Sequence, residues 1–434
     1  MNKYAITNIE ITPLLIADPP LLNFQGVHQP YTPRVLVRIE TAGGEYGVGE
    51  TYGDADILKY LRAFSKKVTE LRVDQSQMLW QYASLYLSEP EIQKLDPNLL
   101  SGKMARNATG INTLHKIHNI AVSVFEVAFL DAMGKLAGLP VHSLLGGKVR
   151  DKVDFAAYLF WKFENHGSAE FPDDHWDEAL DIEGLVEQAR VFIEDYGFTS
   201  IKLKGGYHSP EYESEAIEEL KRLYPEYPVR LDPNGIWSVE KSIEVAQRLS
   251  DTVEYLEDPT DGRQAMSEVY RATEVSLATN MCVTSMDQIP EAVALESVQV
   301  ILCDHHFWGG IRQVQHLSRI CQAFGLGMSM HSNSHLGVSL AAMLHTGAVA
   351  EGELLTLDTH RPWQSEDVVI EPHTFVDGAL TVPDAPGLGV TLDEDSVKKY
   401  HQRWVEMPEF HIRDDVQAMR RFVPDWEKPP VGRW

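Results

Sequence analysis

The chain has 434 residues and a formal net charge of −26, from 64 Asp and Glu against 38 Lys and Arg. This length predicts two or three domains, or one large α/β barrel with additions. A chain this acidic repels phosphate backbones and anionic lipid headgroups at long range, so nucleic acid and membranes are not expected as partners. A hydrophobic fraction of 44% with nine Trp residues excludes a disordered chain.

The N-terminal sequence MNKYAITNIE lacks the basic and then apolar pattern of a signal peptide, and no apolar run reaches the length of a membrane span. We therefore expect a cytoplasmic protein. The odd set Cys282, Cys303 and Cys321 contains no CxxC pair and predicts small buried apolar residues. A solvated surface explains the net charge more simply than adaptation to high salt does.

Residues 1–145 are predicted to form an α+β capping domain. Period-two alternation at 4–16 and 34–41, with Gly43-Gly44 before EYGVGET, indicates an antiparallel meander. Helical patterns follow at 55–71 and 120–139.

Residues 146–385 carry eight short apolar runs that alternate with helical patterns and end in Phe160, Lys204, Asp232, Glu257, Asn280, Asp304, His331 and Asp358. Between two of them, Ser238 is expected to cap a helix at its start, and Gly325 is expected to end another. Eight parallel strands with crossover helices predict a modified TIM barrel of (β/α)7β type. The tail, 386–434, is expected to return to the capping domain.

An open, doubly wound α/β sheet is the alternative fold. It needs a glycine-rich phosphate turn that opens a helix, whereas GGEYGVGE at 43–50 follows a hairpin and does not match GxGxxG. The barrel is therefore favoured.

In such a barrel, the C-terminal ends of the strands meet at one mouth, so the residues that end the runs are candidate site residues. Asp232, Glu257 and Asn280 end three successive runs and offer three hard oxygen ligands, which suit Mg²⁺. The alternative is a structural hydrogen-bond cluster. A zinc motif is not expected from His331 and His335, because the residues between them include no glutamate.

Two candidate proton-transfer groups flank this metal set. Lys202 and Lys204 are two apart in one strand and point to the same side, which favours a neutral Lys204 as a base beside a charged Lys202. Solvated lysines on an edge strand are the alternative. Asp304 and His331 end neighbouring runs and predict a carboxylate–imidazole dyad. A metal between two such groups is typical of enzymes that remove a proton next to a carboxylate.

The pattern of these residues resembles the enolase superfamily, with a capping domain of mandelate racemase type, and within it the glucarate dehydratases. The resemblance spans both predicted domains. It is carried by N-F-Q-G-V-H-Q-P (23–30), G-I-N-T (110–113), Y-L-F (158–160), I-K-L-K-G-G (201–206), L-D-P-N-G-I-W-S (231–238), E-D-P (257–259), A-T-N-M (278–281), H-F-W (306–308), H-S-N-S-H (331–335), D-T-H (358–360) and R-D-D (413–415).

This resemblance implies Mg²⁺-dependent dehydration of D-glucarate, and of its C5 epimer L-idarate, to 5-dehydro-4-deoxy-D-glucarate. It implies Asp232, Glu257 and Asn280 as metal ligands, and Lys204, His331, Asp304, Lys202 and Asn234 as catalytic residues. The residues implied to bind the acid sugar dianion are His28, Thr113, Tyr158, Lys202, Asp232, Asn234, Asn280, His331, Ser332, Asn333, His360 and Arg413. A homo-oligomer is expected.

One segment departs from the glucarate dehydratase pattern. After E-D-P the chain reads T-D-G-R (260–263), a shorter loop than in the dehydratases, where a further acidic residue lies near the metal. Glu257 is retained as a ligand because it ends its run between two other ligands. The alternatives are dehydration or epimerisation of another acid sugar, and a non-catalytic protein that binds acid sugars or assists assembly. Racemases and cycloisomerases are less favoured, because they carry lysine where this chain has Asp304.

Overall fold

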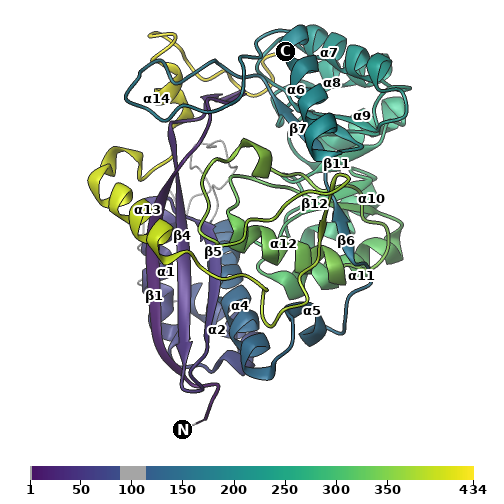
Figure 1. Cartoon of the computed structure of the whole chain (residues 1–434). Coiled ribbons are helices and arrows are strands. Elements are labelled where there is room, and N and C mark those ends of the chain that lie inside the picture. Colours follow the sequence, from purple (N-terminus) through teal and green to yellow (C-terminus); the bar gives the residue numbers. More distant parts are fainter. Residues whose placement is uncertain (1, 88–113) are drawn as a thin grey trace.

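A computed structural model describes residues 2–87 and 114–434 of the chain (Figure 1). An antiparallel sheet with its helices forms an N-terminal layer, and a seven-stranded parallel sheet with its helices forms the barrel beside it. Among the described residues, no helix combines the length and the apolar character that crossing a membrane requires.

The N-terminal layer is the predicted antiparallel meander. Its strands β1 (Ile6–Ala17), β4 (Tyr31–Thr41) and β5 (Tyr46–Tyr52) pair in the order β1-β4-β5. The associated elements are α1 (Ala55–Val68), α2 (Ser76–Leu87), α4 (Leu114–Ala137) and the short strands β2 (Leu22–Asn23) and β3 (Gly26–Val27). The periodicity of the sequence predicted α1 and most of α4 but not α2.

Two glycines let α4 pack directly on β5. A Cβ at Gly47 would lie 1.9 Å from the backbone oxygen of Ala128, and one at Gly49 would lie 2.3 Å from that of Val124. Because these contacts are with backbone atoms, a larger residue cannot be accommodated by a side-chain rotation. The edge strand β5 is thereby held against the buried helix α4.

The barrel sheet has the order β13-β12-β11-β10-β9-β8-β7, with all neighbouring strands parallel. Its strands are β7 (Ala157–Phe160), β8 (Ile201–Lys204), β9 (Val229–Asp232), β10 (Tyr255–Glu257), β11 (Leu277–Thr279), β12 (Val300–Cys303) and β13 (Gly327–Met330). The eighth predicted run, 353–358, forms isolated parallel bridges rather than a regular strand: Leu354 pairs with Met328 and Leu357 with Phe155. It lies between the two ends of the sheet and closes the ring.

Helices connect the strands as expected for crossover connections. They are α6 (Ile182–Tyr196), α7 (Pro210–Leu223), α8 (Val239–Arg248), α9 (Arg263–Thr273), α10 (Ile289–Leu295), α11 (Ile311–Phe324) and α12 (Gly337–Val349). The oxygen of Ser238 accepts a hydrogen bond from the Lys241 backbone and caps α8, and Gly325 ends α11 with a φ of 69°. Both predicted helix ends are confirmed.

The last part of the chain runs back across the N-terminal layer. Helix α13 (Glu394–Glu406) packs on β1, and α14 (Asp415–Met419) packs on β3 (Figure 1). The remaining short elements are α5 (Val141–Leu144) and the antiparallel pair β6 (Lys152–Asp154) and β14 (Ala379–Thr381). One apolar core cluster runs through both layers, from Val37 and Phe125 to Leu203 and Leu231. The domain boundaries given above stay a prediction.

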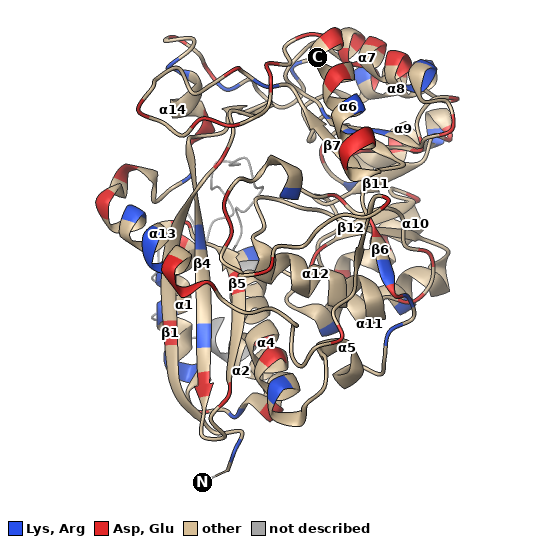
Figure 2. Ribbon diagram, in the orientation of Figure 1, with Lys and Arg blue, Asp and Glu red and all other residues tan. Residues whose placement is uncertain are grey.

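Charge is distributed unevenly over the ribbon (Figure 2). Asp and Glu gather on outer helices of the barrel such as α7, whose sequence PEYESEAIEELKRL contains five glutamates. The strand ends at the barrel mouth carry both signs, in contacts described next.

Candidate active site

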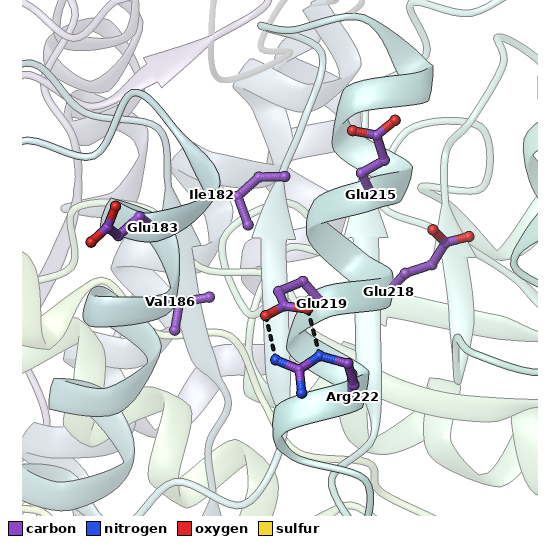
Figure 3. Close-up of a pocket in the computed structure, with 7 residues that line it drawn as sticks. All are labelled: Ile182, Glu183, Val186, Glu215, Glu218, Glu219 and Arg222. Atoms are coloured by element: carbon purple, nitrogen blue, oxygen red, sulfur yellow. Dashed lines mark hydrogen bonds and ion pairs between the residues drawn. The ribbon is translucent and has the colours of Figure 1, made fainter.

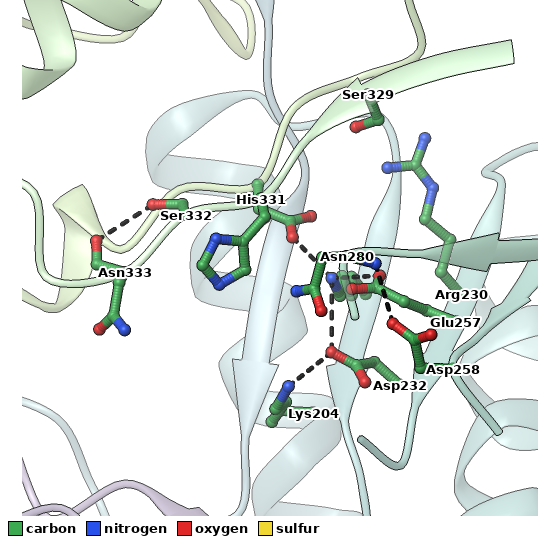
Figure 4. Close-up of polar contacts among 12 residues, drawn as sticks. Lys204, Arg230, Asp232, Glu257, Asp258, Asn280, Ser329, His331, Ser332 and Asn333 are labelled. Atoms are coloured by element: carbon green, nitrogen blue, oxygen red, sulfur yellow. Dashed lines mark hydrogen bonds and ion pairs between the residues drawn. The ribbon is translucent and has the colours of Figure 1, made fainter. Parts of the chain in front are cut away.

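The barrel mouth brings together the residues that were predicted to end its strands. Lys204, Asp232 and Glu257 are the last residues of β8, β9 and β10. Asn280, Asp304 and His331 come directly after β11, β12 and β13. All six are at most 8% exposed, and Figure 4 shows five of them gathered around one space.

Both lysines of β8 lie against carboxylates, and Figure 4 shows Lys204 beside Asp232. The Lys204 ammonium lies 2.6 Å from Oδ2 of Asp232 and donates to Oδ1 of Asn234 at 3.1 Å. The Lys202 ammonium lies 2.5 Å from Oε2 of Glu257 and 2.6 Å from Oδ2 of Asp358. Each ammonium group therefore has a carboxylate within hydrogen-bond distance, and Oδ2 of Asp232 also lies 3.6 Å from the Lys202 ammonium. The sequence predicted a pair of like charges, and the structure adds the carboxylates that lie against both lysines.

The electrostatics of this cluster follow from its burial and its ion pairs. Burial alone would lower the pKa of Lys202, but the charges of Asp358 and Glu257 hold it well above its usual range. Burial raises the pKa of Asp232, yet the ammonium groups of Lys204 and Lys202 bring it below its ordinary value. Burial and the charge of Asp232 raise the pKa of Glu257 well above its ordinary value. Lys202 is thus a fixed positive charge at the base of the mouth.

Asp232, Glu257 and Asn280 of this cluster are the candidate ligands for a divalent cation. Among the described residues, no group of three or more His, Cys, Asp or Glu side chains has a metal-like arrangement. The candidate set Asp232, Glu257 and Asn280 contains an amide, and lysine nitrogens lie against oxygens of both its carboxylates. Oε1 of Glu257 is buried with no hydrogen-bond partner and remains available as a ligand. By donor chemistry these three oxygens fit Mg²⁺.

The predicted dyad forms on the other side of the mouth. Nδ1 of His331 lies 2.9 Å from Oδ2 of Asp304, whose Oδ1 accepts from the Phe307 backbone at 2.7 Å. The His331 ring stacks on Phe307 at 5.2 Å, and Phe307 stacks in turn on Tyr52 of β5 at 5.5 Å. The carboxylate and the stacked rings together fix the plane of the imidazole and leave its Nε2 available for proton transfer.

An aromatic wall leads from the lysines toward the N-terminal layer. The Lys202 ammonium lies 4.7 Å from the ring centre of Tyr158, which contacts His360 at 5.0 Å. His360 contacts Phe160 at 5.3 Å, and Phe160 contacts His28 at 5.9 Å. His28, from the segment between β3 and β4, therefore lies at the end of the wall remote from Lys202.

The other predicted sugar-binding residues surround this wall. Ser332 accepts from the backbone of His360 at 3.3 Å, and Asn333 accepts from Nη1 of Arg413 at 3.3 Å. Arg413 is also paired with Asp415, at 3.0 Å. The C-terminal tail thus contributes to the mouth. Thr113 lies outside the described residues.

Sequence reasoning missed two acidic residues of the mouth. Asp358 pairs with Lys202, and it ends the eighth run, so the rule that found the other strand ends points to it as well. Asp258 accepts from Thr279 Oγ1 at 2.5 Å and from the Asn280 backbone at 2.9 Å, which fixes the start of the Asn280 loop. Burial raises the pKa of Asp258 to about 7. The position of Asp258 directly after Glu257 could have indicated that it lies at the mouth.

A second hollow lies on the outside of the barrel between α6 and α7 (Figure 3). It has a volume of about 570 Å³ and is lined by Ile182, Glu183, Val186, Glu215, Glu218, Glu219 and Arg222. Arg222 is held by Glu219 through two hydrogen bonds. Because its free polar groups are carboxylates, this groove would repel an acid sugar.

Comparison with known proteins agrees with this architecture. A family model described as "Enolase C-terminal domain-like" matches residues 184–396. The chain is 51% identical over 433 residues to a probable glucarate dehydratase of Streptomyces coelicolor, with 99% of each sequence covered.

Solved structures also match this chain over nearly its whole length. An enolase of Mycobacterium smegmatis complexed with tartrate has a TM-score of 0.89 at 44% identity, covering 100% of this chain and 99% of that one. An enolase of Pseudomonas fluorescens with bound magnesium, potassium and tartrate has a TM-score of 0.90 at 41% identity, covering 99% of each. With both layers matched over nearly their whole length, the chain belongs to the enolase superfamily.

Proposed function

We propose that this protein dehydrates acid sugars, with D-glucarate and its C5 epimer L-idarate as substrates and 5-dehydro-4-deoxy-D-glucarate as product. One observation carries the proposal: Lys204 ends β8 and His331 of the His331–Asp304 dyad follows β13, with four strands and the carboxylate–lysine cluster between them. The 51% identical relative named as a probable glucarate dehydratase supports this substrate class.

The chemistry begins at the carbon next to a carboxylate. Lys204, when it is a neutral amine, takes the proton of one C5 epimer, and neutral His331 takes that of the other, because the two groups stand on opposite sides of the mouth. The electron pair of the broken C–H bond moves into the carboxylate, and the fixed charge of Lys202 stabilises the added negative charge. When bound at Asp232, Glu257 and Asn280, Mg²⁺ supplies further positive charge to that carboxylate.

The second half of the reaction expels the hydroxyl group on C4. His331 donates a proton to this oxygen, the C4–O bond breaks, and water leaves. The resulting enol at C5 becomes the ketone when C4 receives a proton. Asp304 stabilises the imidazolium while His331 carries the proton.

The remaining residues hold the sugar and exclude water. Asn234 accepts from Lys204 and orients its ammonium group. Tyr158, Ser332, Asn333, His360 and Arg413 line the path from the reacting end to the N-terminal layer, which covers the mouth. Enclosure of this kind strengthens every charge interaction inside the site.

The short loop after Glu257 favours a second candidate, which is the same dehydration or an epimerisation on another acid sugar. Only three residues, Thr260 to Gly262, separate E-D-P from α9, which begins at Arg263. Pocket contacts rather than the proton-transfer groups choose the sugar. A panel of aldarates and aldonates, assayed for keto acid formation, distinguishes the two candidates.

The decisive test is exchange and product formation with Mg²⁺. The protein should convert D-glucarate to a keto acid and introduce solvent deuterium at C5 of the unreacted substrate, and a chelator should abolish both. Lys204→Ala should remove exchange with one epimer and His331→Asn with the other, whereas Lys398→Met, at an exposed position on α13, should change neither. Equal and small losses in the two site variants, or no keto acid from any acid sugar, would contradict the proposal.

A further inference from the structure

A buried carboxylate on α7 holds the loop that follows Lys204. Glu213 is completely buried, and its Oε2 accepts from the Gly206 backbone at 2.8 Å. Its Oε1 accepts from the backbones of Tyr207 and His208, each at 3.1 Å. These three N–H groups belong to the residues that come just after Lys204, the last residue of β8. Glu213 takes no part in the proton transfers proposed above, so its contacts require another explanation.

The start of α7 does not account for these contacts. Ser209 caps this helix, because its oxygen accepts from the Tyr212 backbone at 3.3 Å, and Pro210 stands in the first turn. Glu213 lies farther along the helix and reaches back past the cap to the loop. Burial raises its pKa to about 7, although the three N–H donors lower it. The carboxylate therefore stabilises the loop before the helix rather than the start of the helix.

This loop is packed closely between α7 and the loop that follows β9. A Cβ at Gly205 would lie 2.5 Å from Oε2 of Glu213, and one at Gly206 would lie 2.9 Å from the backbone oxygen of Pro233. The Gly205 backbone donates to the carbonyl of Asp232 at 2.9 Å. A loop that moved away from Glu213 would therefore change how the end of β8 lies against the end of β9.

The position of the Lys204 side chain depends on this fit. Its nitrogen lies 2.6 Å from Oδ2 of Asp232 and 3.1 Å from Oδ1 of Asn234. The Asn234 backbone donates to Oδ1 of Asp232 at 2.9 Å, so both partners of the lysine belong to one rigid unit at the end of β9. His331 is oriented by Asp304 instead, with four strands between its strand and β8. A change in the loop after β8 should thus affect one proton-transfer group and spare the other.

We propose that Glu213 is a positioning residue for Lys204: by holding the loop after β8 it fixes the lysine nitrogen where it meets the substrate. Glu213 then governs proton transfer with one C5 epimer and not with the other. The relative rates for the two epimers are thereby set partly from behind the barrel strand, by a side chain that does not reach the substrate. This inference rests on the proposed function and adds a residue that controls its stereochemical preference.

The test measures solvent deuterium at C5 of unreacted D-glucarate and L-idarate separately, with saturating Mg²⁺. Exchange is followed about one pH unit above the pKa of about 7, so that Glu213 is ionised in the wild type. The epimer that loses exchange in Lys204→Ala is the one assigned to Lys204. Glu213→Gln should slow exchange with this epimer about 10-fold to 100-fold, because the loop loses a charge-assisted hydrogen bond and the base is displaced. Exchange with the other epimer should change less than about threefold.

Three further variants separate positioning from general damage. Glu126→Gln removes the same charge from a buried carboxylate that accepts from the backbone at the start of α11, and it should leave the ratio of the two exchange rates unchanged. Ser214→Ala removes a hydrogen bond to the Pro210 carbonyl within α7 and should also keep this ratio. Gly205→Ala places a Cβ against the carboxylate of Glu213 and should slow the same epimer as Glu213→Gln. If Glu213→Gln does not fold, Gly205→Ala decides.

Equal slowing of both epimers in Glu213→Gln, no slowing of either, or a changed ratio in Ser214→Ala would overturn the inference. Keto acid formation in the wild type reports on the proposed function separately. If keto acid forms and the ratio does not respond to Glu213→Gln, the function stands and the inference fails. If no acid sugar reacts, the function fails, and the side-chain NMR signal of Lys204 decides the inference. This signal should shift in Glu213→Gln and not in Glu126→Gln, and an unchanged signal would overturn the positioning role.

Discussion

Glu126 joins the two layers, and its carboxyl group predicts how their stability changes with pH. From α4 it caps the start of α11: Oε2 accepts from the Ile311 backbone at 2.8 Å and Oε1 from the Arg312 backbone at 3.2 Å. Burial raises the pKa of Glu126 to about 7, against the opposing effect of these donors. In Glu126→Gln the group stays neutral at every pH.

The direction in which stability changes with pH follows from proton linkage. The folded protein binds the proton of Glu126 more tightly than the unfolded chain, so its contribution to stability is greatest below pH 4.5 and falls as pH rises to about 7. The interval between these pKa values corresponds to about 3 kcal/mol of unfolding free energy. Relative to wild type, Glu126→Gln should therefore gain about 3 kcal/mol between pH 4.5 and 7.5.

Denaturant unfolding of both proteins at several pH values measures this difference, because contributions of other groups cancel between them. Thermal melting gives an independent check. A difference that stays constant with pH would refute the reasoning. If Glu126→Gln instead lost stability relative to wild type as pH rises, the N–H donors of α11 would outweigh burial in setting the pKa of Glu126.

Three further predictions concern the site and the packing beneath it. Glu257→Gln should weaken Mg²⁺ binding at least about tenfold in calorimetry, because it removes a charged ligand; unchanged affinity would exclude Glu257 from the metal set. Asp358→Asn should lower kcat about tenfold without changing Mg²⁺ affinity, because Lys202 loses one of its two carboxylates; an unchanged kcat would show that Glu257 alone positions it. Gly47→Ala should destabilise the fold by at least about 2 kcal/mol, since its Cβ meets the backbone of α4; an unchanged melting temperature would contradict this packing.

The strand ends were predictable because one rule governs them. An apolar run that ends in a functional residue predicts where a parallel strand ends. It also places the last side chain at the carboxyl edge of the sheet. This rule is sufficient for Lys204, Asp232, Glu257 and His331, and for the dyad contact between His331 and Asp304.

Pairings between distant segments were not predictable in this way. The partner of Lys202 on the closing run, Asp358, and the partner of His28, Asp18, depend on how loops from different layers fit together, which no local pattern encodes. Helix α2 was not predicted, because its sequence SQMLWQYASLYL has a weak amphipathic pattern. The expected homo-oligomer and the cytoplasmic location stay predictions.

Residues that frame the remote end of the mouth come from near both termini of the chain: Asp18 and His28 from the start, and Arg413 from the tail. Segments almost 400 residues apart in the chain must therefore come together before this end of the mouth is complete. The residues at this end of the mouth and the proton-transfer residues also lie in different segments of the chain, so they can mutate independently. Mutations in these terminal segments can change which sugar is accepted while the proton-transfer groups on the barrel strands remain intact.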